Sequence, residues 1–455
     1  MHGRDKVESE LSTEKVGKLL VRYSLPAIVA MAASSLYNLV DRIFIGQGVG
    51  PYAISGLAIT LPVMNLAIAL GAMVGVGAAA LVSIRLGQGR GDEAGRILGN
   101  TVALNVVLGV VYSVSMYLFL DPILRLFGAS DETIPYARDF LQIILVGNPF
   151  LHTYMGLNGI MRASGHPTKA MATTLATVGV NLVLAPLFIF VFDWGIRGAA
   201  LATVAGQLVG LVVVVSHFAD KNRKLRFRHG IFSPHPGIVR DILAIGMSSF
   251  FVQAGASLVA VVMNRELAKH GGDFAVGAFG IVNSVLMLMV MVILGIAQGM
   301  QPIAGFNYGA RLYGRVMRVL RHAIVASTLV ACTGFAAAQL LPGPIASAFT
   351  NDPSLHEMAV QGLRWAFLCM PLAGFQIATA NLFQSIGRAK LSIILTLSRQ
   401  IGFLVPGLVI LPRFFGLAGV WAALPISDAA STLLAWFVLR YERKRIARLD
   451  AVPQG

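Results

Sequence analysis

The chain has 455 residues, of which 56% are hydrophobic and only 13% are charged. Soluble proteins carry roughly 25% charged residues, so the composition excludes an ordinary soluble globular protein and indicates that lipid surrounds most of the chain. The net charge of +15 raises the question of nucleic-acid binding. The basic residues lie between apolar stretches rather than on one soluble module, and we therefore expect no nucleic-acid partner.

Apolar stretches long enough to cross a bilayer, about 20 residues each, recur along the whole chain. Gly, Pro or charged residues bound each of them, as expected where a helix leaves the membrane. The first stretch is too long for a cleaved secretory signal. The sequence predicts an all-α integral membrane protein with twelve transmembrane helices. The predicted spans are residues 16–45, 52–81, 97–120, 137–161, 170–192, 198–218, 238–264, 274–303, 317–341, 358–386, 391–412 and 416–439.

Lys and Arg are concentrated on one set of alternate loops, which holds 27 of the 36 basic residues, among them Arg4 in the N-terminal segment. Cytoplasmic loops retain an excess of positive charge. This set therefore marks the cytoplasmic side, and it includes both the N-terminal and the C-terminal segment. We expect both termini to be cytoplasmic.

The two halves of the chain repeat each other at a shift of 222 residues. YAISGLAI at 52–59 aligns with FAVGAFGI at 274–281, and Pro149 falls on Pro371. Six spans per copy make the repeat parallel, so two pseudo-symmetric six-helix bundles are related by an axis along the membrane normal. Channels and membrane enzymes also contain duplicated bundles, but the arrangement favours an alternating-access transporter and not an enzyme. The predicted parts are an N-lobe at 1–220, a cytoplasmic linker at 221–236 and a C-lobe at 237–455.

One acidic residue, Asp41, lies inside the first span. An ionisable group at bilayer depth costs about 2.5–3.5 kcal/mol or more and needs a partner, a cavity or a function. The repeat places Met263 opposite Asp41 and Asn264 opposite Arg42, so a symmetric scaffold does not need the acid. Neutralisation of Arg42 is the structural alternative, but neighbouring helical positions do not face each other. We predict that Asp41 is the ion-coupling residue.

Several oxygen-bearing side chains of the first half accompany Asp41. Together with a carboxylate they can hold a proton, because burial favours the neutral carboxyl, or bind a small hard cation. The coupling ion can therefore be H+ or Na+. For Na+, the expected ligands are Asp41 and Asn181. No cofactor is expected. For Asn158 and Asn181, hydrogen bonding between spans is the alternative. These polar residues are Tyr37, Asn38, Asn158, Asn181, Thr203 and Gln207.

In the second half, Arg399 and Asp428 lie in spans eleven and twelve. They can pair and hold the second bundle together. Asp428 also falls opposite Gln207 in the repeat, which favours a position on the substrate cleft. The candidate substrate-binding residues are Tyr37, Asn38, Gln207, Gln253 and Asp428.

Three segments of the chain resemble the multidrug and toxic compound extrusion (MATE) family. They are SLYNLVDRIFIGQGVGPYAISGLAITLPV at 35–63, GLNGIMRASGHPTKA at 156–170 and GVNLVLAPLFIF at 179–190. The resemblance covers nearly the whole chain and is strongest to the bacterial branch that includes MepA and the DinF proteins.

This resemblance implies an antiporter of the bacterial cytoplasmic (inner) membrane that exports cationic or amphipathic small molecules, driven by inward H+ or Na+. It assigns coupling to Asp41, with Asn158, Asn181 and Thr203 as further members of the site. Many relatives carry a second acid where this chain has Ala185, so Asp41 is expected to carry the charge alone. We expect a monomer.

Two other functions are alternatives to efflux. A lipid-linked oligosaccharide flippase of the same superfamily shares the duplicated bundle, but needs several cations at membrane depth, where only Arg42 and Arg399 lie. A membrane-embedded transferase needs clustered carboxylates for a metal-bound pyrophosphate, and no Asp-rich motif stands at a span end.

Overall fold

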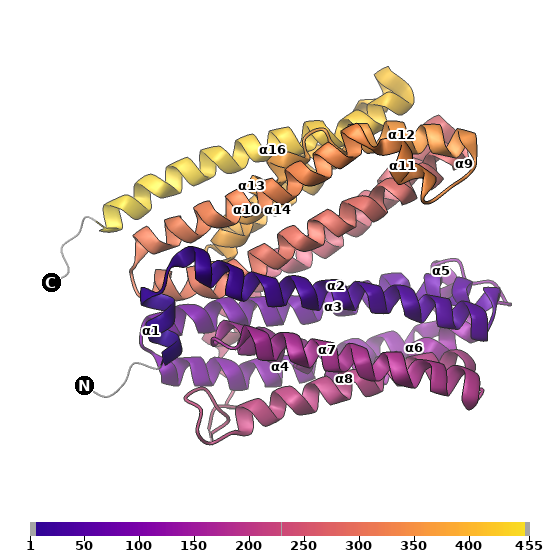
Figure 1. Ribbon diagram of the computed structural model, residues 1–455. Helices are drawn as coiled ribbons and strands as arrows, with labels where there is room; N and C mark the ends of the chain where they lie inside the picture. Colours follow the sequence, from indigo (N-terminus) through magenta and orange to yellow (C-terminus); the bar gives the residue numbers. More distant parts are fainter. Residues whose placement is uncertain (1–5, 229, 451–455) are drawn as a thin grey trace. The chain divides into compact units, whose positions relative to one another are not determined.

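The computed structural model describes residues 6–228 and 230–450, and this part of the chain is helical without any strand (Figure 1). Helices are expected here because a backbone in hydrocarbon must satisfy its own hydrogen bonds. The prediction of an all-α fold is confirmed. Arg4 and the outermost residues of both predicted lobes lie outside the described residues.

Every predicted span corresponds to a helical segment. Nine helices are long and apolar enough to cross a membrane among the described residues, and α12 with α13, bent by 49°, make a tenth span. The 74-residue α9 contains two of the predicted spans. The remaining predicted span, 137–161, lies in α6. The helices are α1 Lys6–Thr13, α2 Val16–Gly48, α3 Pro51–Gly87, α4 Gly91–Leu118, α5 Leu120–Leu126, α6 Ile134–Ala163, α7 Pro167–Pro186, α8 Gly195–Ala219, α9 Pro236–Gly309, α10 Tyr313–Leu340, α11 Pro342–Ser347, α12 Pro353–Phe367, α13 Met370–Ser385, α14 Ala389–Leu397, α15 Val405–Ile410 and α16 Pro412–Asp450, with π-helical turns η1 at Leu187–Val191 and η2 at Ser398–Leu404.

The backbone carries the same repeat as the sequence. Gly50 and Gly272, 222 residues apart, both have positive φ, at 113° and 68°. Gly195 and Gly416, which are 221 residues apart and so lie one residue off the repeat, have φ of 53° and 55°. Glycine adopts this left-handed conformation without the steric cost of a Cβ atom. Turns at matching places therefore separate matching spans in the two halves.

The chain divides into two compact units. The first contains residues 6–9 and Val29–Phe250, and the second contains Glu10–Ile28 and residues 251–450. Helix α2 passes from one unit to the other at Ile28, two residues after Pro26, its internal proline. A proline inside a helix removes one backbone hydrogen bond and favours a kink.

In the first unit, α6 is the central helix and packs against α3, α4 and α8 (Figure 1). Small residues allow this close packing. A Cβ atom on Gly109 of α4 would lie 2.7 Å from the Pro149 Cα of α6, and one on Gly159 would lie 3.2 Å from the Gly75 carbonyl oxygen of α3. Backbones therefore touch where α6 crosses its neighbours.

In the second unit, α13 takes the corresponding place and packs against α10, α14 and α16. Its apolar core surrounds Trp421, which is 2% exposed and contacts Phe279 at a ring-centroid distance of 6.4 Å. A Cβ atom on Gly362 would lie 2.8 Å from the Trp421 ring. The indole thus fills a space that a glycine leaves open.

Residues 220–235 form no helix where described, and they pack on the first unit. Asn100 donates to the Ser233 carbonyl at 3.2 Å and accepts from the His235 backbone N–H at 2.8 Å. The segment predicted as the linker is therefore anchored to α4 by a buried amide.

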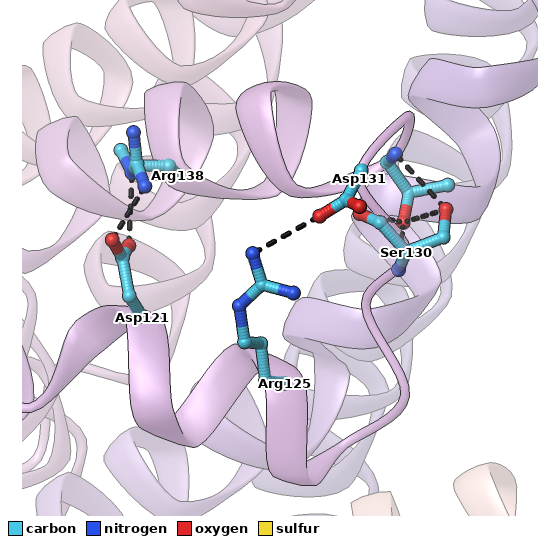
Figure 2. Close-up of polar contacts among 6 residues, drawn as sticks. Asp121, Arg125, Ser130, Asp131 and Arg138 are labelled. Carbon is cyan, nitrogen blue, oxygen red and sulfur yellow. Dashed lines mark hydrogen bonds and ion pairs between the residues drawn. The ribbon is translucent and has the colours of Figure 1, made fainter.

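Two ion pairs close the turn between α4 and α6 around the short helix α5 (Figure 2). Arg138 Nε donates to Asp121 at 2.8 Å, and Arg125 donates to Asp131 at 3.0 Å. The Ser130 backbone N–H donates to the Thr133 hydroxyl beside them. Exposed ion pairs contribute about 0–1 kcal/mol, so these contacts shape the turn more than they stabilise the protein.

Substitution at Gly246 tests the close packing of α9 on α3. A Cβ atom there would lie 1.7 Å from the Met73 carbonyl oxygen, whereas one on Gly280 of the same helix meets nothing within 4 Å. We expect Gly246→Ala to destabilise the protein by about 1–3 kcal/mol through overpacking. Gly280→Ala should be neutral or stabilise by about 0.5–1 kcal/mol. Thermal unfolding in detergent measures both, and equal midpoints would contradict the packing argument.

Candidate ion-coupling site

Asp41 lies on α2 with 8% of its surface exposed. Its Oδ1 atom is buried and accepts no hydrogen bond from the described residues. Arg42 beside it is exposed, and no ion pair joins the two in the described part of the chain. The acid is thus buried while its cationic neighbour points elsewhere, as expected for successive helical positions.

A short chain of polar contacts links α2 to α7 and α8 one turn before Asp41. The Tyr37 hydroxyl lies 3.4 Å from the Thr203 hydroxyl, and the Asn181 side-chain amide donates to the same Thr203 oxygen at 3.2 Å. Thr203 in turn donates to the Ala199 carbonyl at 3.1 Å. Residues four apart share a helix face, so Asp41 lies on the side of α2 that carries Tyr37.

One turn after Asp41, the contact of α2 becomes apolar. Ile45 is fully buried and belongs to a cluster with Ala185 and Ile189. A Cβ atom on Gly48 would lie 2.3 Å from Ile189. Asp41 therefore lies between a polar and an apolar contact of α2, and Ala185 is part of the apolar one.

The other polar residues predicted for the first half differ in burial and in their hydrogen-bond partners. Gln207 follows Thr203 by one turn on α8, and its Oε1, like Asn181 Oδ1, is buried and accepts no hydrogen bond from a described residue. Asn158 donates to the Ala170 carbonyl at 3.1 Å, a contact between helices. Asn38 is exposed and donates within its own helix to Ser34.

The remaining candidates, Gln253 and Asp428, belong to the second unit. Arg399 donates to Asp428 at 2.8 Å, so the ion pair expected between spans eleven and twelve is present. Asp428 is 5% exposed, and the Arg399 side chain, in the π-helical turn η2, is 30% exposed. Gln253 is half-buried. The carboxylate of Asp428 is thus already satisfied by a cation.

Three buried polar residues were not singled out from the sequence. Asn105, Asn148 and His152 are each at most 2% exposed in the interior of the first unit. They lie on α4 and α6 as isolated polar positions among apolar residues and form no motif. The rule that polar groups at membrane depth are costly, applied to His152, would have selected that position.

The site offers oxygen ligands only. Among the described residues, no three His, Cys, Asp or Glu side chains gather where they could hold a metal ion. One carboxylate oxygen and two amide oxygens, on α2, α7 and α8, are buried and accept no hydrogen bond from the described residues. A buried carboxylate oxygen of this kind suits a proton or a hard cation, for which oxygen atoms are the preferred ligands.

Comparison with known proteins places the whole chain among transporters. The MatE family model matches residues 26–187 and 247–409. The multidrug export protein MepA of Staphylococcus aureus (strain NCTC 8325 / PS 47) is 26% identical over 431 residues, which cover 95% of each chain. MepA of Staphylococcus haemolyticus (strain JCSC1435) is 26% identical over 94% of each chain.

Solved structures agree with the sequence relatives. The crystal structure of MATE in the bent conformation has a TM-score of 0.93 at 27% identity, covering 99% of this chain and all of the other. An outward-facing multidrug resistance MATE family transporter of the MOP superfamily matches with a TM-score of 0.91, 27% identity and the same coverage. The residues that match the family model comprise most of both halves, including α2 from Pro26 onward, α7 and η2. The chain belongs to the MatE family and is a helical membrane transporter, not an enzyme.

Proposed function

We propose that this protein is a multidrug efflux antiporter that exports cationic or amphipathic compounds, driven by an inward gradient of H+ or Na+ that is coupled through Asp41. The observation that carries the proposal is a buried carboxylate oxygen without a described hydrogen-bond donor, one turn from the Tyr37, Thr203 and Asn181 contacts. The similarity to two staphylococcal proteins named multidrug export protein MepA supports the substrate class.

Coupling follows from the position of Asp41 on α2. A charged carboxylate in an apolar setting is costly unless it is paired, and a bound proton or cation removes that cost. The change acts on a helix that packs on α7 and α8 after Pro26 and on the second unit before it, where Ser24 contacts the Ile296 carbonyl at 3.4 Å. Ion binding would therefore change how α2 packs.

Structures of a relative support a mobile helical arrangement. MATE has been solved in a bent and in a straight conformation, and both match this chain, with TM-scores of 0.93 and 0.91. If the ion and the substrate favour different conformations, each lowers the affinity for the other by the same factor. The ion gradient then drives export in the opposite direction.

Asp41→Asn tests the coupling residue. The amide keeps the size of the side chain but cannot exchange a proton at this site or carry a charge. Coupling free energies correspond to about 5- to 150-fold changes. We therefore expect the rate of gradient-driven efflux of a fluorescent cation from reconstituted vesicles to decrease by about 5- to 150-fold. Asp193→Asn is the matched control, since Asp193 lies at positive φ of 56°, which asparagine tolerates. Unchanged efflux in Asp41→Asn would refute the proposal.

The coupling ion is identified by imposing one gradient at a time. If Na+ is the ion, a sodium gradient alone drives efflux, and Asn181→Leu raises the Na+ concentration needed for half-maximal efflux because an oxygen ligand is lost. If H+ is the ion, a proton gradient alone suffices and sodium has no effect. Efflux under neither gradient would exclude both couplings.

Asp428→Asn tests whether Asp428 binds substrate. Because Asp428 pairs with Arg399, we expect the variant to lower the free energy of unfolding by about 1–3 kcal/mol, since a buried partner is left unsatisfied. Its unfolding temperature should fall, while the KM for cationic substrates stays unchanged. The double variant Arg399→Gln/Asp428→Asn should recover part of the stability. A raised KM with unchanged stability would instead assign Asp428 to the substrate site.

A further inference from the structure

A cavity of about 840 Å³ opens in the second unit, between α10, α13 and α16. Its walls are single helix faces. Residues 317, 318, 320, 321, 324 and 325 line it from α10, and residues 436, 439, 440, 443 and 444 line it from α16. These spacings of three and four residues define one side of each helix. Phe375 contributes from α13, on which both walls pack.

Five cations line this cavity, and no acid does. Among the described residues, no carboxylate lies within ion-pair distance of any of the five. The nearest acid along α16, Glu442, is 3% exposed and pairs with Arg445 at 3.5 Å instead. The cavity therefore has a strongly positive rim without an internal counter-charge. The cations are Arg318, Arg321, Arg440, Arg443 and Lys444.

The remainder of the lining is apolar. Leu320, Phe375 and Leu439 contribute hydrocarbon surface, and Trp436 is 43% exposed beside them. The Arg440 guanidinium lies over the Trp436 ring, 5.2 Å from its centroid. Tryptophan and arginine side chains of this kind are typical of the boundary between hydrocarbon and headgroups.

The lining follows the membrane axis in a definite order. On α10 the cations Arg318 and Arg321 come before the apolar Val325, and on α16 Trp436 comes before Arg440 and Arg443. Both cationic ends belong to the segments that the Lys and Arg distribution predicts to be cytoplasmic. The positive end thus lies at headgroup level, and the apolar part lies deeper.

We infer that this cavity binds an anionic glycerophospholipid of the cytoplasmic leaflet, with the phosphate among the five cations and an acyl chain along Leu320, Phe375 and Trp436. Basic pockets between transmembrane helices on this side are suited to acidic headgroups. A cationic export substrate is disfavoured here, because five like charges repel it. Two smaller cavities, in the first unit, each contain an acid, Asp220 or Asp92, which disfavours an anionic ligand there.

Tryptophan fluorescence of the full-length protein tests the site. The protein is reconstituted in phosphatidylcholine vesicles that contain a minor fraction of phosphatidylglycerol, with bromine on the acyl chains of either lipid to quench nearby indoles. Subtracting the signal of Trp436→Phe isolates Trp436 from Trp194, Trp365 and Trp421. We expect Trp436 to be quenched more by brominated phosphatidylglycerol than by an equal fraction of brominated phosphatidylcholine.

Two double variants separate a site from general surface attraction. Arg321→Gln/Arg443→Gln should lower the preference for phosphatidylglycerol by about fivefold for each cation removed, whereas Arg321→Lys/Arg443→Lys should keep most of it. Arg90→Gln/Lys221→Gln removes the same charge from exposed positions outside the cavity and should leave the preference unchanged. Equal quenching by both lipids in the unaltered protein, or an equal loss in both charge-removing variants, would overturn the inference.

Discussion

The constraint on which the structure depends is that hydrocarbon offers no partner to a backbone amide. Each span must therefore close its own hydrogen bonds, and helices follow wherever apolar residues continue for about 20 positions. Breaks fall where glycine permits positive φ, as at Gly50 and Gly272. The helical arrangement of this chain, and its repeat, are direct consequences.

The same constraint changes how helices hold together. Apolar side chains gain little by leaving lipid for another helix, so close packing supplies the attraction. Gly109 and Gly159 allow α6 to touch its neighbours, and Gly246 does the same for α9. Two helices, α2 and α9, contain residues of both units. α2 belongs to the second unit up to Ile28 and to the first unit from Val29, and Asp41 lies in its second part.

Polar groups are rare enough in such a protein that each carries information. Asp428 forms an ion pair with Arg399. Asp41, in contrast, is buried, and its Oδ1 atom accepts no hydrogen bond from the described residues. Ala185 belongs to an apolar cluster of the first unit, so this position offers no second carboxylate. The proposed coupling by one charge rests on this contrast between the two buried aspartates.

The sequence by itself determined the helical class, the spans, the repeat and the asymmetry of Asp41, because apolar length and residue spacing are local properties of the chain. Only the tertiary structure decided which polar side chains meet. Thr203 contacts both Tyr37 and Asn181, whereas Asn38 points away. The basic cavity likewise brings residues 317–325 of α10 together with residues 436–444 of α16, more than 100 residues later in the chain. Such meetings depend on how each helix is rotated about its axis and packed, and no local pattern specifies that rotation.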